Sequence, residues 1–289
     1  MLGRSERESG AHALAAARQG AWDTHENLDE PSDLLDLGAM TAALATVSRI
    51  EGLRGVMHVG HPAAPDHDLE RALLASSASL RVTAVEAVAS RWVWVARGTE
   101  LDGHVVVDEA GMRDCRHQLR TLGASPHLVP ARTPLAERVA LAGEHGSLVV
   151  ERDHVPDGFT EVAGSSALSE RAPLWYGLVE PVPEPADFDA PAQVWLAFGP
   201  RDDHKGSLKL TLSLVSEAGI DLQHLRSQPS VDGPHVFFAS FSVPTSAPLR
   251  ALKAELSERG VAHRVLGVMA GEVFEPGPAA VEPVWTSRD

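Results

Sequence analysis

Histidine and aspartate side chains cluster in one short stretch of the chain. The cluster spans eleven residues and consists of His58, His61, His67 and Asp68. A His-x-x-His spacing is typical of metal sites, where imidazole and carboxylate groups bind the ion. On an extended strand, however, side chains alternate in direction, so His58 and His61 would point to opposite sides. A zinc site also needs a third or fourth ligand at a fitting distance, so we predict polar loop histidines, with no metal and no cofactor.

The one cysteine, Cys115, is the other side chain with intrinsic reactivity. It shares one face of an expected helix with Met112, Leu119 and Leu122. We therefore predict a buried core thiol rather than a nucleophile. A single cysteine forms no internal disulfide, which fits a cytoplasmic localisation.

Composition limits the classes of function. A length of 289 residues with 44% hydrophobic residues is enough for two domains with cores of their own. The net charge of −15 argues against nucleic-acid binding, which depends on a basic surface. No apolar run approaches the ~20 residues that span a bilayer, so we expect no membrane partner.

The last third of the chain has a regular pattern of strands and helices. Ala192–Met269 reads as strand, helix, strand, strand, helix, strand. The expected helices cover Gly206–Gly219 and the segment from Ser246, as N-cap, to Gly260; the expected strands are Val194–Phe198, Ile220–Leu225, Val236–Val243 and Val261–Met269. This order predicts an antiparallel sheet with two helices on one face.

The region before it alternates helices with short strands and ends in a proline-rich linker at 181–187. Besides a docked helix within 1–22, we expect helices over 34–48, 67–75, 110–122 and 134–142. The expected strands lie at 56–59, 80–87, 92–96, 105–107, 128–130, 148–151 and 175–179. Such alternation favours α/β layers.

The C-terminal third resembles the ACT domain of prephenate dehydratases, a module that commonly senses amino acids. The segments Gly206-Ser207-Leu208, Gly219-Ile220-Asp221-Leu222 and Leu225-Arg226-Ser227-Gln228-Pro229 are similar to the family's Gly-Ala-Leu, Gly-Ile-Asn-Leu and Ile-Glu-Ser-Arg-Pro. In the family, the first and third motifs line a phenylalanine site between paired ACT domains. The resemblance implies a homodimer through ACT domains and a ligand such as phenylalanine or a related amino acid, held by Gly206, Ser207, Leu208, Ser227 and Pro229. Arg226 and Gln228 replace the family's Glu and Arg.

The front region is similar to the dehydratase domain of the same family. The matching segments are Ser9–Ala16 at a helix start, Gly55–Val59, Leu80–Glu86, Gly111–Cys115 and Arg132-Thr133. The resemblance implies a two-lobed, periplasmic-binding-protein-like α/β domain over 1–180 with a cleft between its lobes. A linker at 181–191, a ferredoxin-like α+β ACT domain at 192–270 and an irregular tail at 271–289 would follow.

The residues that carry dehydration in the family are missing. The family's Thr-Arg-Phe motif, whose Thr helps the leaving hydroxide, falls on Pro173–Val179, which offers neither Thr nor Arg. Asp108 and Glu109 stand where an anionic substrate would dock. The remaining substrate-cleft candidates are Thr133, Glu86, Arg132 and Arg171. Thr133 lies at an expected helix N-terminus. There it would either help to bind an anion or act only as the N-cap of the helix.

Three functions remain open. The first is a regulatory or non-catalytic relative that keeps an amino-acid-sensing ACT domain in phenylalanine metabolism. The second is an enzyme of altered chemistry on prephenate or a similar acid, like the prephenate decarboxylases. The third is an active prephenate dehydratase, a carbon–oxygen lyase that forms phenylpyruvate. An arginine or lysine in the inter-lobe cleft would favour the enzymes, and an apolar or acidic lining would favour the regulatory relative.

Overall fold

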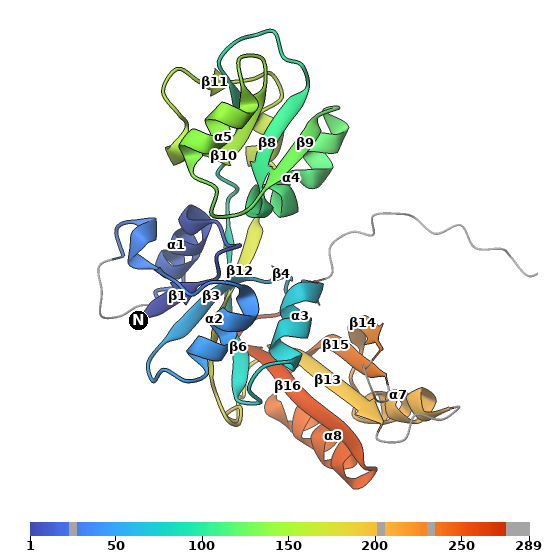
Figure 1. The fold of residues 1–289 in the computed structure, drawn as a ribbon. Coiled ribbons are helices and arrows are strands. Elements are labelled where there is room, and N and C mark those ends of the chain that lie inside the picture. The colour runs from blue at the N-terminus through green and yellow to red at the C-terminus, as the bar shows by residue number, and fades with distance from the viewer. Residues whose placement is uncertain (23–27, 201–205, 230–234, 276–289) are drawn as a thin grey trace, which may run out of the picture. The chain divides into compact units, whose positions relative to one another are not determined.

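The computed structural model describes residues 1–22, 28–200, 206–229 and 235–275. Two compact units divide the chain. The first unit consists of Met1–Gly60 and Asp66–Pro185, and the second of His61–Pro65 and Ala186–Asp289. The fold is mixed α/β with several sheets (Figure 1). Within the described residues, no helix has both the length and the apolar character needed to cross a membrane.

One half of the first unit contains five strands in the order β6-β12-β3-β1-β2. Strand β1 pairs in parallel with β2 and β3, whereas β12 is antiparallel to both β3 and β6. The strands are β1 (Leu2–Arg4), β2 (Leu35–Asp36), β3 (Arg54–His58), β6 (Leu80–Val88) and β12 (Leu174–Pro181). The helices are α1 (Gly10–Gln19), α2 (Met40–Val47), α3 (His67–Leu74) and the 3-10 turn η1 (Pro31–Asp33). A two-residue pair, β4 (Gly60–His61) and β5 (Ala64–Pro65), follows β3.

The other half contains a second sheet in the order β11-β7-β10-β8-β9. Its strands are β7 (Trp92–Ala96), β8 (His104–Asp108), β9 (Ser125–Val129), β10 (Ser147–Glu151) and β11 (Thr160–Glu161). Its helices are α4 (Glu109–Thr121), α5 (Leu135–Ala142), α6 (Ser166–Ser169) and the 3-10 turn η2 (Arg152–His154). Every residue of β7 and β10 is buried, as expected for strands covered on both faces.

A shared core joins the two halves of the first unit. It brings Val56 and Leu178 of the first sheet together with Val107 and Val149 of the second. Cys115 belongs to this core and is fully buried, and burial raises the pKa of its thiol. The prediction of a buried core cysteine is confirmed.

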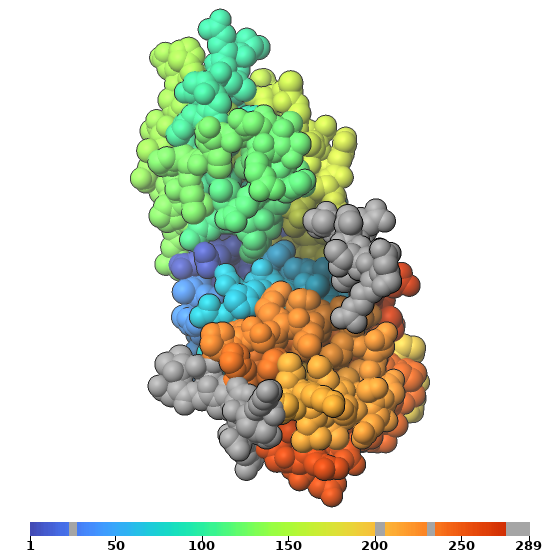
Figure 2. Space-filling view, turned by 90° about the vertical axis from the view of Figure 1, so that its right-hand side faces the viewer, coloured from blue at the N-terminus to red at the C-terminus, as the bar shows by residue number. Residues whose placement is uncertain are grey.

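The second unit has the predicted element order, with strands arranged β14-β15-β13-β16 and every neighbouring pair antiparallel. The elements are β13 (Ala192–Pro200), α7 (Ser207–Glu217), β14 (Leu222–Gln228), β15 (Val236–Val243), α8 (Ser246–Glu258) and β16 (Val261–Ala270). Helices α7 and α8 contact each other and lie at the surface, in light orange and orange-red in Figure 2. Trp195 is buried and donates from Nε1 to the Pro62 carbonyl oxygen at 2.7 Å, so residues 61–65 belong to this unit.

Two local predictions are wrong, and one strand was not predicted. The helix expected over 34–48 begins only at Met40, because 35–36 pair with β1 and Gly38 adopts a φ of +79°. Residues 2–4 form a strand, too short to show an alternating pattern, before the helix expected within 1–22. The N-cap of α8 is Thr245, whose hydroxyl accepts from the Ala247 N–H, and Ser246 is the first helical residue.

Candidate functional site

Three helix starts surround a cavity of about 480 Å³ between the two halves of the first unit. Helix α1 starts after Ser9, α4 after Asp108 and α5 after Pro134. We call this cavity the charged cleft; its ionisable lining residues are Arg4, Glu6, Glu8, Asp36, Asp108, Arg132, Arg138, Glu151 and His154. Helix N-termini present backbone N–H groups that suit an anion. The side chains at this cleft decide whether an anion can use them.

The arginines of the charged cleft are held by the protein's own acceptors. Arg132 contacts the Glu6 and Asp36 carboxylates, each at 3.0 Å. Arg138 pairs with Asp108 at 2.9 Å and donates its other Nη to the Val149 carbonyl oxygen at 2.5 Å.

Arg4 donates to the backbone carbonyls of Ser5 and Glu8 at 3.3 and 3.0 Å. The lining holds five carboxyl side chains against three arginines. An additional anion would therefore meet an acidic surface whose Arg132 and Arg138 guanidinium groups are already paired.

Ser9, His12 and Glu151 form a buried hydrogen-bond chain beside this cleft. The Arg91 N–H donates to His12 Nε2 at 2.7 Å, so the imidazole proton lies on Nδ1, which contacts Ser9 Oγ. Ser9 Oγ in turn donates to Glu151. Burial lowers the pKa of His12 to about 4, which keeps the ring neutral at pH 7. His12 therefore donates to Ser9 and does not act as its base.

His154 completes the environment of Glu151, with Nδ1 at 3.1 Å from its Oε2. Burial alone would raise the pKa of Glu151, but hydrogen bonds from His154 and Ser9 lower it. The same hydrogen bond raises the pKa of His154. Glu151 is therefore a stable carboxylate in the lining and adds to its negative charge.

A buried ionic cluster lies next to the cleft and centres on Arg113. We define the Arg113 cluster as Glu8, His58, Arg113, Asp114 and Tyr176. Arg113 contacts Glu8 at 3.0 Å and Asp114 at 2.8 Å, and His58 Nε2 lies 3.9 Å from Asp114. Asp114 also accepts from Trp92 Nε1 at 2.9 Å. The Arg113 guanidinium is thus neutralised from within the protein.

The electrostatics of the Arg113 cluster follow from its burial. Burial raises the pKa of Glu8 even against the attraction of Arg113. Burial would also raise the pKa of Asp114, but Arg113 and the Trp92 hydrogen bond bring it down to about 2. Burial together with the positive charge of Arg113 lowers the pKa of His58 to about 3. His58 is therefore neutral at pH 7 and a poor source of positive charge for a substrate.

The four predicted cleft residues have different surroundings. Only Arg132 belongs to the lining of the charged cleft. Thr133 precedes the true N-cap, Pro134, so the N-cap alternative is wrong; its N–H donates to the Pro130 carbonyl at 3.0 Å. Glu86 on β6 accepts from Gln19 Nε2 at 2.7 Å. Arg171 is half-buried and donates to the Ala172 carbonyl at 3.3 Å.

Strand β12 occupies the position expected for the missing Thr-Arg motif. Tyr176 pairs with His58 on one side and Glu86 on the other, and it is fully buried. Its hydroxyl has no hydrogen-bond partner within the part of the chain that the structure describes. Leu174 is also buried. We find no exposed hydroxyl donor on this strand to assist a leaving group.

The predicted amino-acid site of the second unit is spread over two elements. Gly206, with a φ of +103°, precedes α7, while Ser227 is on β14 and Pro229 follows it. Since β13 and β14 both run antiparallel to β15, the end of β14 and the start of α7 lie at the same end of the sheet. Ser207 is buried, whereas Leu208 lines a shallow cavity of about 460 Å³ on α7.

Sequence reasoning placed Asp108 and Arg132 at the cleft but missed the ion pairs that determine the charge of the cleft. Asp108 could have been recognised as an N-cap, because its side chain accepts from the Gly111 N–H at 2.8 Å. Its pairing with Arg138, 30 residues later, has no local signal. Likewise Glu8 and Arg113 are 105 residues apart. The prediction of polar loop histidines is wrong for His58, which ends β3 and belongs to the Arg113 cluster, and for His67, which begins α3. His61 Nδ1 accepts from the Ala63 N–H at 3.2 Å.

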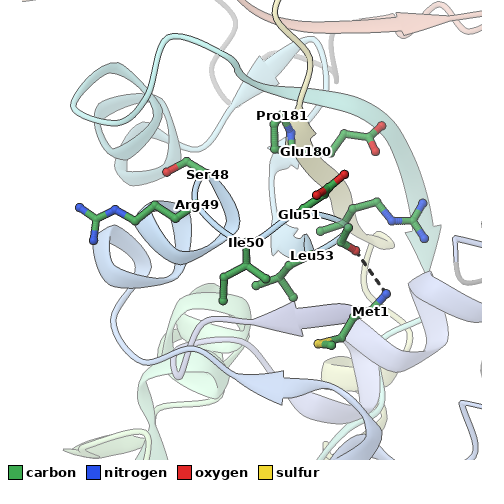
Figure 3. A pocket seen from close by; sticks show the side chains of 10 residues that line it. Met1, Ser48, Arg49, Ile50, Glu51, Leu53, Glu180 and Pro181 are labelled. Atoms are coloured by element: carbon green, nitrogen blue, oxygen red, sulfur yellow. Dashed lines mark hydrogen bonds between the residues drawn. The ribbon is translucent and has the colours of Figure 1, made fainter.

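A further cavity of the first unit, about 660 Å³, lies where the end of α2 meets the N-terminus (Figure 3). The Met1 ammonium donates to the Gly52 carbonyl oxygen at 3.4 Å across it. Its ionisable side chains are Arg49, Glu51, Arg54 and Glu180. No cluster of catalytic type converges there among the described residues, so we do not assign it a role.

Comparisons with known proteins give matches at the level of structure. No protein-family model matches the chain, and no curated protein matches it in sequence. A prephenate dehydratase from Staphylococcus aureus subsp. aureus Mu50 superposes with a TM-score of 0.63 at 12% identity, covering 93% of this chain and 99% of that one. A prephenate dehydratase from Arthrobacter aurescens in complex with L-Phe gives 0.67 at 18% identity, covering 96% and 94%.

A third structure belongs to a protein described as GqqA, a novel type of quorum quenching acylase. It gives a TM-score of 0.54 at 17% identity and covers 94% of this chain and 98% of that one. These likenesses extend over both units and confirm the predicted resemblance at the level of fold. The chain therefore has a prephenate dehydratase-like fold.

Proposed function

We propose that this protein is a regulatory relative of the prephenate dehydratases in phenylalanine metabolism. In this proposal the first unit is a two-lobed domain that has lost dehydration. The second unit is an ACT domain that binds phenylalanine or a related amino acid and forms the homodimer. The observation that carries the proposal is the charged cleft, where Arg132 and Arg138 are paired with Glu6, Asp36 and Asp108.

Dehydration of prephenate makes demands that this cleft does not meet. The substrate carries two carboxylates, so the site must supply cations, and the departing hydroxide needs a proton donor. Binding two more carboxylates would require Arg132 or Arg138 to exchange its present partners. That exchange gains little, because one carboxylate merely replaces another. The buried Tyr176 does not reach the lining, and the neutral His58 adds no cation.

The proposed amino-acid site rests on the family resemblance and on one structurally similar protein. The Arthrobacter aurescens structure holds L-Phe. In this chain Gly206 and Leu208 lie at the start of α7, and Ser227 lies near the end of β14. Residues Arg226 and Gln228 depart from the family motif. Phenylalanine is therefore the first ligand to test, with related amino acids beside it.

The test is incubation of the purified protein with prephenate, followed by proton NMR of the products. The proposal expects prephenate to decay only at its spontaneous rate. Phenylpyruvate above that background would establish an active dehydratase, and a non-aromatic decarboxylated product would establish a decarboxylase-type lyase. Either product would refute the regulatory assignment.

Phenylalanine binding is measured separately by calorimetry and light scattering. We expect a saturable heat and a dimer at micromolar concentration. Leu208→Glu should weaken binding at least tenfold, because it places a charge in the shallow cavity on α7. Leu210→Glu is the matched control, since Leu210 is 46% exposed on the same helix and does not line that cavity. A monomer, or equal effects of the two variants, would contradict this part of the proposal.

The acylase likeness does not favour a second function. An acyl-transfer nucleophile must be accessible and needs a base that takes its proton. Ser9 is 5% exposed, and His12 donates to it. We therefore assign no acyl-transfer role to the pair.

A further inference from the structure

A third cavity of the first unit, about 690 Å³, lies beside the Arg113 cluster. Residues from the start of α2, from α3, from α4 and from β9 line it. We call it the arginine cavity. Its charged residues are Arg7, Asp66, Asp68, Arg71, Glu109, Arg113 and Arg116, and its apolar residues include Met40, Ala72, Ala75, Met112 and Leu128. None of the predicted site residues belongs to this lining.

Most charges of the arginine cavity already have partners. Arg7 pairs with Glu109 at 3.2 Å, and Arg113 is held by the Arg113 cluster. Asp66 caps α3 by accepting from two backbone N–H groups at 2.9 and 3.2 Å. Their charges are therefore compensated inside the protein and contribute little to recognition.

Arg71 and Arg116 differ from these residues. Both are exposed, and neither guanidinium group forms an ion pair or hydrogen bond within the described part of the chain. Arg71 belongs to α3 and Arg116 to α4, so the two guanidinium groups come from opposite halves of the unit. In a protein of net charge −15, two unpaired arginines on one cavity form a local site for an anion.

The apolar part of the lining defines the rest of the ligand. Leu128 is 52% exposed, and Met112 is half-buried. Methionine side chains adapt their shape to an apolar ligand. The carboxylate of Asp68, which has no ion pair among the described residues, lies one turn before Arg71 on α3 and would repel a second negative charge. The lining thus favours one carboxylate on an apolar body over a diacid.

We propose that the arginine cavity binds a small monocarboxylic acid with an apolar body. The carboxylate is held by Arg71 and Arg116, and the body packs against Met40, Met112 and Leu128. This site is separate from the charged cleft and from the amino-acid site of the second unit. It does not depend on the regulatory function proposed above.

The experiment uses the full chain labelled with 13C at its methionine methyl groups and titrated with 3-phenylpropionate. The chain has five methionines, so the spectrum is simple. We expect the Met40 and Met112 signals to shift together. The buried Met57 and Met269, the latter in the second unit, should stay in place. Two results would overturn the proposal. The first is a shift of the Met269 signal alone. The second is no shift at all up to about 10 mM ligand, because such a Kd is too weak for a specific site.

Chemical specificity is tested with three further probes. The alcohol 3-phenyl-1-propanol lacks the charge, acetate lacks the body, and phenylsuccinate adds a second carboxylate. Each should bind at least about tenfold more weakly than 3-phenylpropionate, since a tenfold change matches the loss of one charge-assisted contact. Binding of the alcohol as tight as that of the acid would show an apolar pocket only, and would refute the role of the arginines.

The arginines are tested by Arg71→Ala and Arg116→Ala, each expected to weaken 3-phenylpropionate binding about tenfold. The matched control is Arg120→Ala, which removes the same charge one turn further along α4 and outside the lining. All three residues are exposed, so the variants should fold. Equal affinities for the three variants would overturn the assignment.

Discussion

Replacement of Arg113 by methionine tests the buried ionic cluster most directly. Arg113 is the cation between Glu8 and Asp114, whose side chains are 0% and 1% exposed. Without it, two carboxylates remain buried with no compensating charge. Removal of one partner from such a cluster costs about 3–5 kcal/mol of unfolding free energy. We therefore expect Arg113→Met to lower the stability of the first unit by that amount at pH 7.

The pKa values allow a check on this magnitude. Asp114 is held at a pKa of about 2 in the folded protein, below its ordinary 3.8. Since one pKa unit is worth about 1.4 kcal/mol, this depression alone accounts for about 2 kcal/mol at neutral pH. A depressed carboxyl pKa stabilises the fold above about pH 4, and that stability is lost as the pH falls towards 2. The remaining cost in the variant comes from Glu8, which loses its only ion-pair partner among the described residues.

The assay is urea unfolding followed by tryptophan fluorescence, because Trp92 donates to Asp114 and reports on the cluster. The control Arg116→Met removes an exposed arginine from the same helix and should change stability by less than about 0.5 kcal/mol. The deficit of Arg113→Met should shrink from pH 7 to pH 5, because protonation of the carboxyls relieves their uncompensated charge. A second substitution, Glu8→Gln, should restore part of the lost unfolding free energy. A loss below about 1 kcal/mol, or one independent of pH, would refute the reasoning.

Three further expectations concern single contacts. Ser9→Ala should cost about 1–3 kcal/mol in thermal unfolding, because it removes the α1 cap and leaves Glu151 short of a donor; a neutral result would deny the hydrogen-bond chain a structural role. Trp195→Phe should cost about 1 kcal/mol by losing the hydrogen bond to Pro62, measured by the melting temperature of the second unit. The His58 ring should stay neutral in NMR titrations down to about pH 4, because burial lowers its pKa to about 3. That pKa contributes stability at pH 7 that is lost as the pH falls from about 6.5 towards 3, and a titration near 6.5 would contradict it.

The second unit was predictable from sequence because its signals are local. Strands β13 and β15 have nine and eight residues, in which apolar side chains follow one another or alternate with polar ones. A glycine follows the end of each helix. In the first unit β1 and β2 have three and two residues, too few for any periodicity. Their strand character comes from pairing with each other and with β3, which is tertiary information.

The candidate site was less predictable for a related reason. The family resemblance located Arg132 and Asp108 in one cleft, but residue types alone could not show that both are already paired. Arg132 meets Asp36 across 96 positions of sequence, and Arg113 meets Glu8 across 105. The sequence spacing of residues so far apart does not indicate that they form ion pairs. Only one of the four proposed substrate residues therefore lines the charged cleft.

One acidic residue of the charged cleft, Asp108, also stabilises the fold. Asp108 caps α4 by accepting from the Gly111 N–H and at the same time holds Arg138, whose second Nη donates to the Val149 carbonyl on β10. Replacing Asp108 to free Arg138 for a substrate would therefore sacrifice a helix cap and leave a buried guanidinium unpaired. Substitution of Asp108 therefore cannot free Arg138 for an anion without loss of stability. The pairing of Arg138 with Asp108 is therefore the observation that most directly supports the regulatory function proposed above.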